Sequence, residues 1–359
     1  MHASGEWSAW SQDGLAKRAI VLRSARPTPA FPLAWSRDRP IIPDIDLFKD
    51  GGFVKRVLVT GANGMLGSEV MRLLGRNSAV TALGTAMKDM DVTNLRSVKE
   101  TMERFRPSHV IHCAAYTFVD TAEKEPVKAY AINAEGTKNL AFFCREQDVE
   151  LLYVSTDYVF DGSKRQPWVE TDATGPLNVY GRSKLLGEVY TQTLLERHKI
   201  IRTSWLNGLG GDFSRNFIET MLRISESRST LSLVNDQVGR PTFTFDLAQV
   251  LVTLLDVRAY GVFHVTNGGE CSWYDFAREI FAQHGRTGLT LRPILSEQFR
   301  SAARRPSYSV MANTRLPGLG IAALPDWRES LREYFRRRSM VSSIKMPSEL
   351  GPSPAALRA

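Results

Sequence analysis

Short apolar runs alternate with amphipathic stretches along most of this chain. Strand-like runs cover residues 55–60, 79–84, 110–115 and 151–157, and a further run ends near residues 91–93. Helical patterns follow these runs, the first of them extending to Leu74. Because parallel strands need a crossover connection, usually a helix, this alternation predicts an α/β fold with a doubly wound parallel sheet.

The two ends of the chain lack this pattern. Residues 1–53 contain Arg, Pro, Ser and Trp without a sustained helical or strand period, so we expect a non-core extension that precedes the working protein. Residues 339–359 are rich in Ser and Pro and are expected to be a disordered tail.

The segments in between predict two domains. Residues 54–204 plus 243–261 form the expected dinucleotide-binding Rossmann domain, which includes a helix over residues 245–257. Residues 205–242 plus 262–338 form a smaller, discontinuous α/β substrate domain. A last amphipathic helix over residues 326–337 closes it, with Trp327, Leu331, Tyr334 and Phe335 on one face.

A glycine loop joins the first strand to the first helix. Glycines permit a tight turn and a close approach of backbone N–H groups to a pyrophosphate, while the helix N-terminus adds a positive dipole. A plain strand-to-helix turn is the alternative. The expected cofactor-binding residues of this loop are Gly61, Asn63, Gly64, Met65, Leu66 and Gly67.

The next strands suggest how the rest of a nicotinamide cofactor is held. The run 79–84 ends without the Asp or Glu that grips a ribose 2′-hydroxyl, and Thr85 and Lys88 follow, which favours NADPH and leaves NADH open. Asp91 and Val92 are candidates for contact with the adenine, unless Asp91 caps the helix that starts near Leu95.

The run 110–115 ends in small residues at the carboxyl edge of the sheet, where ligands bind in such folds. Ala114, Ala115 and Tyr116 are therefore further cofactor-binding candidates. His112 lies inside the apolar run, so we interpret it as a core histidine with hydrogen-bond partners rather than a ligand or base.

Tyr180 and Lys184 stand four residues apart at a helix start and so share one face. A phenol has a pKa near 10, and a fixed cation beside it makes it a better acid. We expect both residues to act in catalysis, and the family resemblance described below implies that both also bind the cofactor. Thr156, at the end of a strand, is the third candidate, because a hydroxyl there can hold a carbonyl oxygen, whereas Ser155 is expected to face the core.

Composition and charge narrow the function classes. Hydrophobic residues make up 43%, no apolar run reaches the roughly 18 residues of a membrane span, and three scattered cysteines favour a reducing cytoplasm. The net charge is +8, with six arginines against Glu297 between Arg286 and Arg315. Such a field suits a nucleotide diphosphate, although a solvated basic surface is the alternative. No basic aromatic stripe indicates nucleic acid.

Several motifs together resemble the extended short-chain dehydrogenase/reductase family and, within it, the dTDP-4-dehydrorhamnose reductases. They are GANGMLG (61–67), STDYVFDG (155–162), ETDATGPLNVYGRSKLLGE (170–188), RTSW (202–205), NDQVGRPT (235–242), TNGGECSWYDFA (266–277) and ARRPSYSV (303–310). The resemblance spans about residues 54–335, and the order of the motifs makes it specific.

The resemblance implies roles for these residues. Tyr180 would donate the proton, Lys184 would hold the nicotinamide ribose and lower the phenol pKa, and Thr156 would bind the keto oxygen. Further substrate-binding residues would be Asp157, Trp205, Asn216, Arg240 and Arg305. Trp205 as a core residue, Asn216 as a helix cap and Arg305 as a surface charge are the structural alternatives.

The resemblance also bears on metal binding. Some members of the family bind magnesium between subunits through glutamates, and Glu69 stands at a matching place. The segment 241–246 lacks the later glutamate, so we expect no metal. A homodimer is left open as the assembly.

The implied reaction is a single reduction of the C4 keto group of a dTDP-bound 4-keto-6-deoxy-L-sugar by NAD(P)H, giving dTDP-L-rhamnose. Two alternatives stay open. One is another nucleotide-sugar 4-keto reductase or epimerase, which would share every catalytic residue. The other is a cofactor-binding regulatory subunit similar to that of methionine adenosyltransferase, which also keeps the Tyr and Lys spacing.

Overall fold

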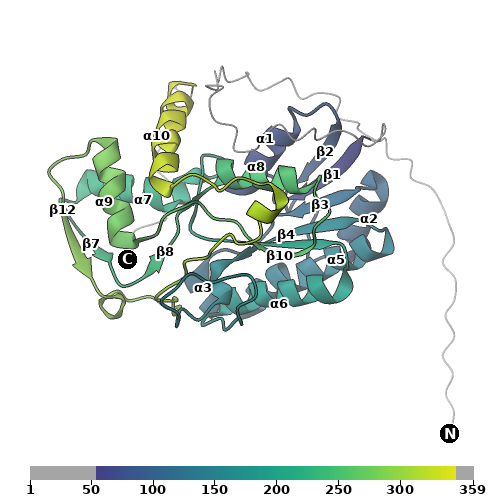
Figure 1. Cartoon of the computed structure of the whole chain (residues 1–359), viewed down its shortest axis with the longest axis horizontal. Coiled ribbons are helices and arrows are strands. Elements are labelled where there is room, and N and C mark those ends of the chain that lie inside the picture. The colour runs from purple at the N-terminus through teal and green to yellow at the C-terminus, as the bar shows by residue number, and fades with distance from the viewer. Residues whose placement is uncertain (1–53, 345–359) are drawn as a thin grey trace, which may run out of the picture. The chain divides into compact units, whose positions relative to one another are not determined.

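The computed structural model describes residues 54–344, arranged around a parallel sheet (Figure 1). The six strands pair in the order β10-β5-β4-β3-β1-β2, all parallel. This confirms the predicted α/β fold with a doubly wound sheet. The strands are β1 (Lys55–Thr60), β2 (Val80–Thr85), β3 (His109–His112), β4 (Glu150–Thr156), β5 (His198–Thr203) and β10 (Gly261–His264).

Helices cover both faces of this sheet. They are α1 (Met65–Leu74), α2 (Leu95–Phe105), α3 (Val119–Lys124), α4 (Pro126–Tyr130), α5 (Gly136–Glu146), α6 (Val179–Leu194) and α8 (Thr244–Leu254). Helices α1 and α8 pack together on one face, while α2, α5 and α6 pack on the other (Figure 1).

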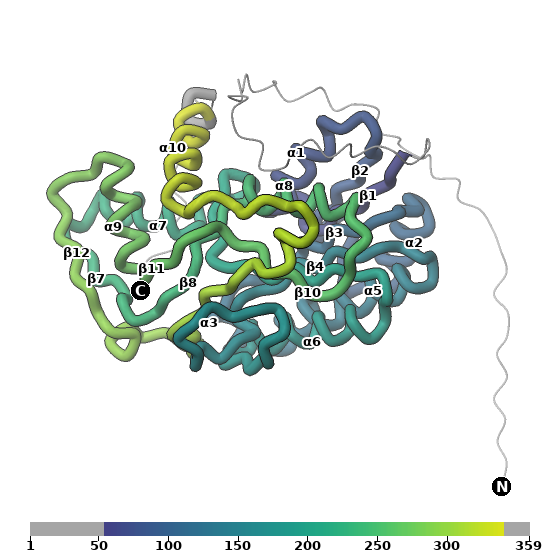
Figure 2. Tube along the Cα trace, in the orientation of Figure 1, coloured from purple at the N-terminus to yellow at the C-terminus, as the bar shows by residue number. Residues whose placement is uncertain are grey.

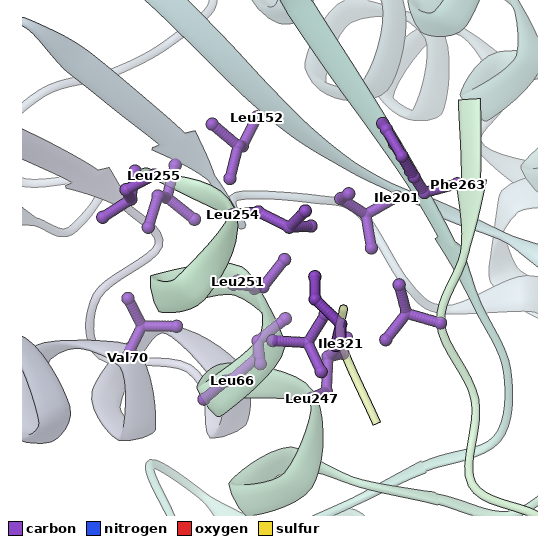
Figure 3. Close-up of a cluster of buried hydrophobic side chains, with 14 of the residues drawn as sticks. Leu66, Val70, Leu152, Ile201, Leu247, Leu251, Leu254, Leu255, Phe263 and Ile321 are labelled. Atoms are coloured by element: carbon purple, nitrogen blue, oxygen red, sulfur yellow. The ribbon is translucent and has the colours of Figure 1, made fainter. Parts of the chain in front are cut away.

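The alternating direction of strand side chains divides the core into two layers. Val57 and Val59 of β1 point to the layer that α1 and α8 cover, which also contains Leu152 and Leu251 (Figure 3). Leu58, between the two valines, points to the layer under α2 and α5. Apolar residues on both faces are what a strand buried between two helix layers requires.

The remaining elements form a second core. They are β6 (Leu206–Asn207), α7 (Phe217–Ser227), β7 (Thr230–Val234), β8 (Val238–Gly239), β9 (Thr242–Phe243), β11 (Cys271–Ser272), α9 (Trp273–His284), β12 (Thr290–Ile294) and α10 (Trp327–Ile344). Strand β12 pairs with β7 and β11 pairs with β8, so segments far apart in sequence lie side by side (Figure 2).

Two predicted boundaries change. Strand β10 pairs with β5, so the sheet takes residues up to His264 rather than up to 261. After the roles that the sequence predicts for them, we call residues 54–204 plus 243–264 the dinucleotide half, and residues 205–242 plus 265–338 the substrate half. The predicted helix over 245–257 is α8, which begins at Thr244 and ends at Leu254.

The last helix is longer than expected. Helix α10 runs from Trp327 to Ile344, so the first residues of the segment predicted to be disordered from 339 onward are helical. Composition misled here, because the Ser residues at 339, 342 and 343 continue a helix that packing of Trp327 and Leu331 has already anchored. The extension at 1–53 and the chain after 344 lie outside the described residues.

The strand expected to end near residues 91–93 is absent from the described structure. The backbone from Ala86 to Asn94 makes local turn hydrogen bonds, among them Asp89 to Ala86 and Asn94 to Asp91. Met90 and Val92 are buried in the layer under α2 and α5 without joining the sheet. The apolar side chains therefore suggested a strand that does not form. Backbone N–H groups of this segment donate to turn carbonyl oxygens and not to a neighbouring strand.

None of the helices between residues 54 and 344 combines the length and the apolar character that crossing a membrane would require.

Candidate active site

The glycine loop lies at the carboxyl end of β1, beside the point where the strand order reverses between β1 and β3. Gly61 has a φ of +65°, and a Cβ there would stand 2.7 Å from the Ala114 nitrogen. A Cβ on Gly67 would stand 2.2 Å from the Gly61 oxygen. A side chain at either position would collide with backbone, so the two glycines allow the loop, the start of α1 and the segment after β3 to pack this closely.

The start of α1 is suited to an anion. Its N-cap residue, Gly64, offers no side-chain hydrogen bond, and its first turn contains no acidic residue. The first N–H groups of a helix carry partial positive charge and need partners. Together with the tight glycine loop, these groups fit the pyrophosphate of a nicotinamide dinucleotide.

Thr85 and Lys88, the two residues considered for a 2′-phosphate, differ in their exposure to solvent. Thr85 is buried and its hydroxyl points back to the Val59 oxygen at 3.5 Å. Lys88 is exposed. Of the two, Lys88 is therefore the one whose charge is accessible to a phosphate.

Asp91 does not cap the helix near Leu95, as one reading of the sequence suggested. The side chain of Asn94 accepts hydrogen bonds from the backbone nitrogens of Arg96 and Ser97 and so caps α2. The Asp91 carboxylate accepts from the backbone and the hydroxyl of Thr93 at 2.9 and 2.8 Å. Its contact with adenine stays a prediction, as does that of the neighbouring Val92.

The segment after β3 is fixed by two polar side chains. The Thr60 hydroxyl accepts from the Ala114 nitrogen at 3.2 Å. Asn133, which lies in a π-helical turn over Ala131–Glu135, accepts from the Tyr116 nitrogen and donates to the Tyr116 oxygen. Ala114, Ala115 and Tyr116 thus follow β3 at the expected sheet edge, next to Gly61.

His112 is a core residue, which confirms the prediction. It is fully buried, and its two ring nitrogens lie 2.7 Å from the Thr60 hydroxyl and 3.1 Å from the Thr137 hydroxyl. Burial lowers its pKa to about 3, so the ring is neutral at physiological pH.

Tyr180 lies in the first turn of α6. Asn178 caps this helix by accepting from the Gly181 nitrogen, and Gly181 packs so closely on the Tyr158 oxygen that a Cβ would stand 2.2 Å from it. The Thr156 side chain is close enough to lower the pKa of the Tyr180 phenol. Its ring meets that of Tyr158 edge-on, with centroids 5.9 Å apart. Two neighbouring elements therefore fix the phenol.

Lys184 lies one turn further along α6 and is buried. Its Nζ donates to the Val154 oxygen at 2.6 Å and stands 4.1 Å from the centre of the Tyr153 ring. Burial lowers the pKa of Lys184 to about 7, while the carboxylate of Glu188 acts in the opposite direction.

The expected effect of Lys184 on the phenol is not seen in this structure. Burial raises the pKa of Tyr180 to about 12, the hydrogen bond from Thr156 counteracts it, and the nearby Asp157 carboxylate adds to the rise. Within residues 54–344, no hydrogen bond joins the Lys184 Nζ to the Tyr180 hydroxyl. At neutral pH the phenol is thus fully protonated, which is the form that a proton donor needs.

The end of β4 supplies the third catalytic candidate. The Thr156 hydroxyl donates to Asp157 at 3.1 Å and accepts from the Tyr158 nitrogen. Ser155 faces the core, as predicted, and donates to Glu188 at 2.5 Å. Burial raises the pKa of Asp157 to about 7, although hydrogen bonds from Ser309 and Thr156 oppose the rise.

Trp205 stands at the start of the substrate half with a φ of +45°. Its ring stacks on that of Trp273, with centroids 3.4 Å apart and planes 4° from parallel. A Cβ on Gly239 would stand 2.5 Å from the indole. Trp205 thus keeps partial exposure while two segments of the substrate half hold it.

Arg305 is brought to the site and is not an isolated surface charge. Its guanidinium makes two hydrogen bonds to Asp120, at 3.2 and 2.6 Å, and interacts with the phenol of Tyr158, which touches Tyr180. Arg240 donates to the Met311 oxygen at 2.6 Å. Burial lowers the pKa of Arg240, and the Glu270 carboxylate opposes this.

Asn216 is a helix cap, which is the structural alternative that the sequence analysis named for it. It caps α7 by accepting from the Glu219 nitrogen, and its amide donates to the Gly208 oxygen and the Tyr334 hydroxyl. The residue is 3% exposed, and both of its N–H groups have partners. A role in the fold accounts for Asn216, and its substrate contact is a prediction without further support.

Glu69 is engaged by cations of the chain itself. It pairs with Arg72 on α1 and, at 3.3 Å, with Arg337 on α10. Within residues 54–344, no group of three or more His, Cys, Asp or Glu side chains is placed to hold a metal ion.

Three residues at the site had no role assigned from the sequence. Tyr158 packs on Tyr180, Asp120 holds Arg305, and Glu188 lies next to Lys184 in α6. Tyr158 and Glu188 lie inside motifs that carried the resemblance, and Asp120 lies on the loop after β3. Their positions in the sequence could have drawn attention to these three residues. The residues that they contact become visible only in the folded structure.

A glycine cradle at the sheet's switch point, with a phenol, a hydroxyl and an ammonium beside it, defines a nicotinamide-dependent reductase of the short-chain type. The model of the RmlD substrate binding domain matches residues 55–340. The chain belongs to this family.

Relatives extend the comparison. A dTDP-4-dehydrorhamnose reductase of Streptomyces griseus is 42% identical, covering 78% of this chain and 93% of the relative. A dTDP-4-keto-6-deoxy-D-glucose reductase of Streptomyces niveus is 40% identical, covering 78% and 96%. The crystal structure of dTDP-4-dehydrorhamnose reductase from Bacillus anthracis in complex with NADP is 39% identical, covers 79% and 99%, and has a TM-score of 0.75.

Proposed function

We propose that this protein reduces the C4 keto group of dTDP-4-dehydro-6-deoxy-L-mannose (dTDP-4-dehydrorhamnose) with NADPH to give dTDP-L-rhamnose. The observation that carries the proposal is the placement of Tyr180 and Lys184 one turn apart on α6, with Lys184 bound to β4, the strand that ends in Thr156, in a member of this family. The relatives named dTDP-4-dehydrorhamnose reductase support the substrate, and the NADP complex of one of them supports the cofactor.

The hydroxyls of Thr156 and Tyr180 are suited to stabilise the charge that develops on the substrate oxygen. NADPH supplies the hydride when it is bound. Thr156 and Tyr180 would provide two O–H donors for one substrate oxygen once the Thr156 hydroxyl turns away from Asp157, and both would stabilise the negative charge that develops there. Tyr180 then gives up its proton to that oxygen. General-acid help of this kind contributes roughly 10²–10⁴ in rate.

Of the two roles that the resemblance implied for Lys184, we keep the binding of the nicotinamide ribose, because the pKa of Tyr180 shows no contribution from Lys184. Its Nζ uses one hydrogen for the Val154 oxygen and retains two further N–H groups. We assign these to the hydroxyls of the nicotinamide ribose, which would place the ring beside Tyr180. The glycine cradle and Lys88 would take the pyrophosphate and the 2′-phosphate.

The substrate half would bind the sugar nucleotide. Trp205, fixed by its stack on Trp273, offers an apolar wall to the sugar. Asp157 and Arg305 lie next to the catalytic hydroxyls, and Arg240 and Arg305 carry charge suited to a diphosphate. Contact of Asn216 with the nucleotide is the weakest of these assignments.

A second candidate is the C4 reduction of another dTDP-4-keto-6-deoxy sugar. The relative named dTDP-4-keto-6-deoxy-D-glucose reductase is as similar to this chain as the rhamnose enzymes are. Both reactions need the same proton donor and hydride, so the catalytic residues do not separate them. The sugar configuration would be selected around Trp205 and Asp157.

The deciding experiment gives the protein dTDP-glucose, the 4,6-dehydratase and the 3,5-epimerase, and follows the loss of NADPH and, separately, of NADH. The proposal expects NADPH loss only when the epimerase is present, with dTDP-L-rhamnose as product. Turnover without the epimerase would favour the second candidate. NADPH binding without turnover on either sugar would favour a regulatory subunit.

The assembly and the location follow as separate proposals. A homodimer in the cytoplasm is the state we propose for a reductase of this kind. Light scattering of the purified protein at working concentration tests the assembly, and a single-chain mass would contradict it. Fractionation of cells tests the location.

A further inference from the structure

Lys184 is a buried cation whose surroundings are almost entirely neutral. The residue is 2% exposed, and burying an unpaired ammonium is costly. The titratable and charged groups that face it come from its own helix and from three strands. They are Tyr180 and Glu188 on α6, His112 and Cys113 at β3, Tyr153 on β4 and Arg202 on β5.

Most of these groups carry no charge at neutral pH. Burial lowers the pKa of His112 to about 3 and raises that of Cys113 to about 12. Burial also raises the pKa of Tyr153 and that of Tyr180. Among these groups, Glu188 is therefore the anion available to Lys184.

Glu188 follows Lys184 by four residues on α6, so the two side chains share a face of the helix. It is 1% exposed. One of its oxygens accepts from the Ser155 hydroxyl at 2.5 Å and from Arg202 Nε at 3.0 Å, and the other accepts from Arg202 Nη2 at 2.7 Å. Its orientation is therefore fixed by β4 and by β5.

Arg202 keeps the Glu188 carboxylate ionised and fixes its orientation. A bidentate guanidinium holds a carboxylate in its ionised form and in one plane. Its side chain is 5% exposed and lies against the Phe160 ring, so solvent does not weaken the pair. Without Arg202, a buried carboxylate at this point would itself tend to bind a proton.

We propose that Glu188, held by Arg202 and Ser155, is a positioning residue that keeps Lys184 charged, so that the ammonium, which the Val154 oxygen orients, can bind the cofactor ribose. Within residues 54–344, the Glu188 side chain makes no hydrogen bond or ion pair with Lys184, Tyr180 or Thr156. It therefore acts on the Lys184 charge through the buried interior and not by contact. This inference rests on the proposed function for the use of Lys184, but not for the identity of the sugar.

The test is Glu188→Gln, which keeps the size of the side chain and removes its charge. NADPH affinity is measured by fluorescence from about pH 5.5 to about pH 9, and kcat/KM is measured over the same range. We expect the alkaline fall of both quantities to move down by about one pH unit, which makes binding near pH 7.5 about tenfold weaker. Near pH 5.5 the variant should approach the unaltered protein.

A matched control is available on the same two strands. Lys199 on β5 and Glu150 on β4 form an equally buried ion pair at the opposite end of the sheet. Glu150→Gln should lower the melting temperature without moving the pH dependence of NADPH binding. If both variants moved it equally, the effect would belong to general stability and the proposal would be wrong.

Because Glu188→Gln leaves Arg202 buried without its partner, the single variant can fail to fold. The double variant Glu188→Gln/Arg202→Met removes both charges and should recover the melting temperature while keeping the displaced alkaline fall. A double variant that folds and shows the unaltered pH dependence would overturn the proposal. So would a loss of binding that is equal at every pH.

The binding titration also separates this inference from the proposed function. NADPH affinity can be followed without any sugar nucleotide. Absence of turnover on both candidate sugars, with a displaced binding profile in Glu188→Gln, would reject the reductase and leave the role of Glu188 intact.

Discussion

In the dinucleotide half, the candidate residues occupy contiguous pieces of chain, whereas in the substrate half single residues arrive from separate segments. The cradle is one loop between β1 and α1, and Tyr180 and Lys184 share α6. By contrast, Trp205 depends on Trp273, and Arg305 reaches the site through Asp120. The first kind of site should respond sharply to single changes in its own motif, and the second should respond in a graded way.

The largest effect is expected from Tyr180→Phe, which removes the proton donor and keeps the ring against Tyr158. We expect kcat to fall roughly 10²–10⁴-fold, with NADPH affinity nearly unchanged. Steady-state kinetics and a fluorescence titration measure the two quantities. Tyr190→Phe, on the exposed side of the same helix, is the matched control and should leave both as they were. Full activity in Tyr180→Phe would remove the basis of the mechanism.

Gly67→Ala tests the cradle. The added Cβ would stand 2.2 Å from the Gly61 oxygen, which is backbone and has no rotamer to change. We expect NADPH binding to weaken by ~10²-fold, about 2.7 kcal/mol. Gly318→Ala is the control, because a Cβ there meets nothing within 4 Å. Equal affinities in the two variants would show that the loop adapts and that the cradle is not rigid.

The pH dependence of NADPH binding tests Lys184. Burial lowers its pKa from 10.5 to about 7, so the free protein loses this proton as pH rises through 7. If the ammonium binds the ribose, NADPH affinity should be level below this pH and fall up to about tenfold per pH unit above it. Fluorescence titrations of the unaltered protein and of Lys184→Met check this, since the variant should bind weakly at every pH.

The same group makes an opposite contribution to stability. Between about pH 7 and 10.5 the unfolded chain holds a proton that the folded protein has released, so the cost of burying Lys184 decreases as pH rises. Binding and stability should therefore change in opposite directions across this range. A parallel fall of both would indicate general unfolding.

The smallest effect is expected in the substrate half. Arg305→Met removes the pair with Asp120, whose side chain is 45% exposed, and such half-exposed pairs contribute about 0.2–1 kcal/mol. If Arg305 also meets the substrate, KM for the sugar nucleotide should rise about tenfold while NADPH affinity stays constant. Arg304→Met, exposed and adjacent, is the control. A change in NADPH affinity with an unaltered KM would move Arg305 to the cofactor side.

Sequence patterns were most reliable where local rules dominate. The alternation of strands and helices predicted the parallel sheet that the structure has. The spacing of the glycines and of Tyr180 and Lys184 predicts the two ends of the cofactor site. The environment of His112 also followed from its apolar neighbours. The strand predicted near residues 91–93 was wrong for a local reason. Met90 and Val92 are buried apolar side chains, as in a strand, but the backbone around them forms turns.

The amino-acid sequence by itself determined the fold class, and it predicts the glycine cradle and the catalytic side chains, because each depends on residues close together in the chain. Tertiary structure alone decided which charges meet. It placed Arg202 against Glu188, Asp120 against Arg305, and the Lys184 ammonium under the Val154 oxygen. These partners come from different strands and helices, and their burial sets the protonation of Lys184 and Tyr180, a property that no spacing along the chain contains.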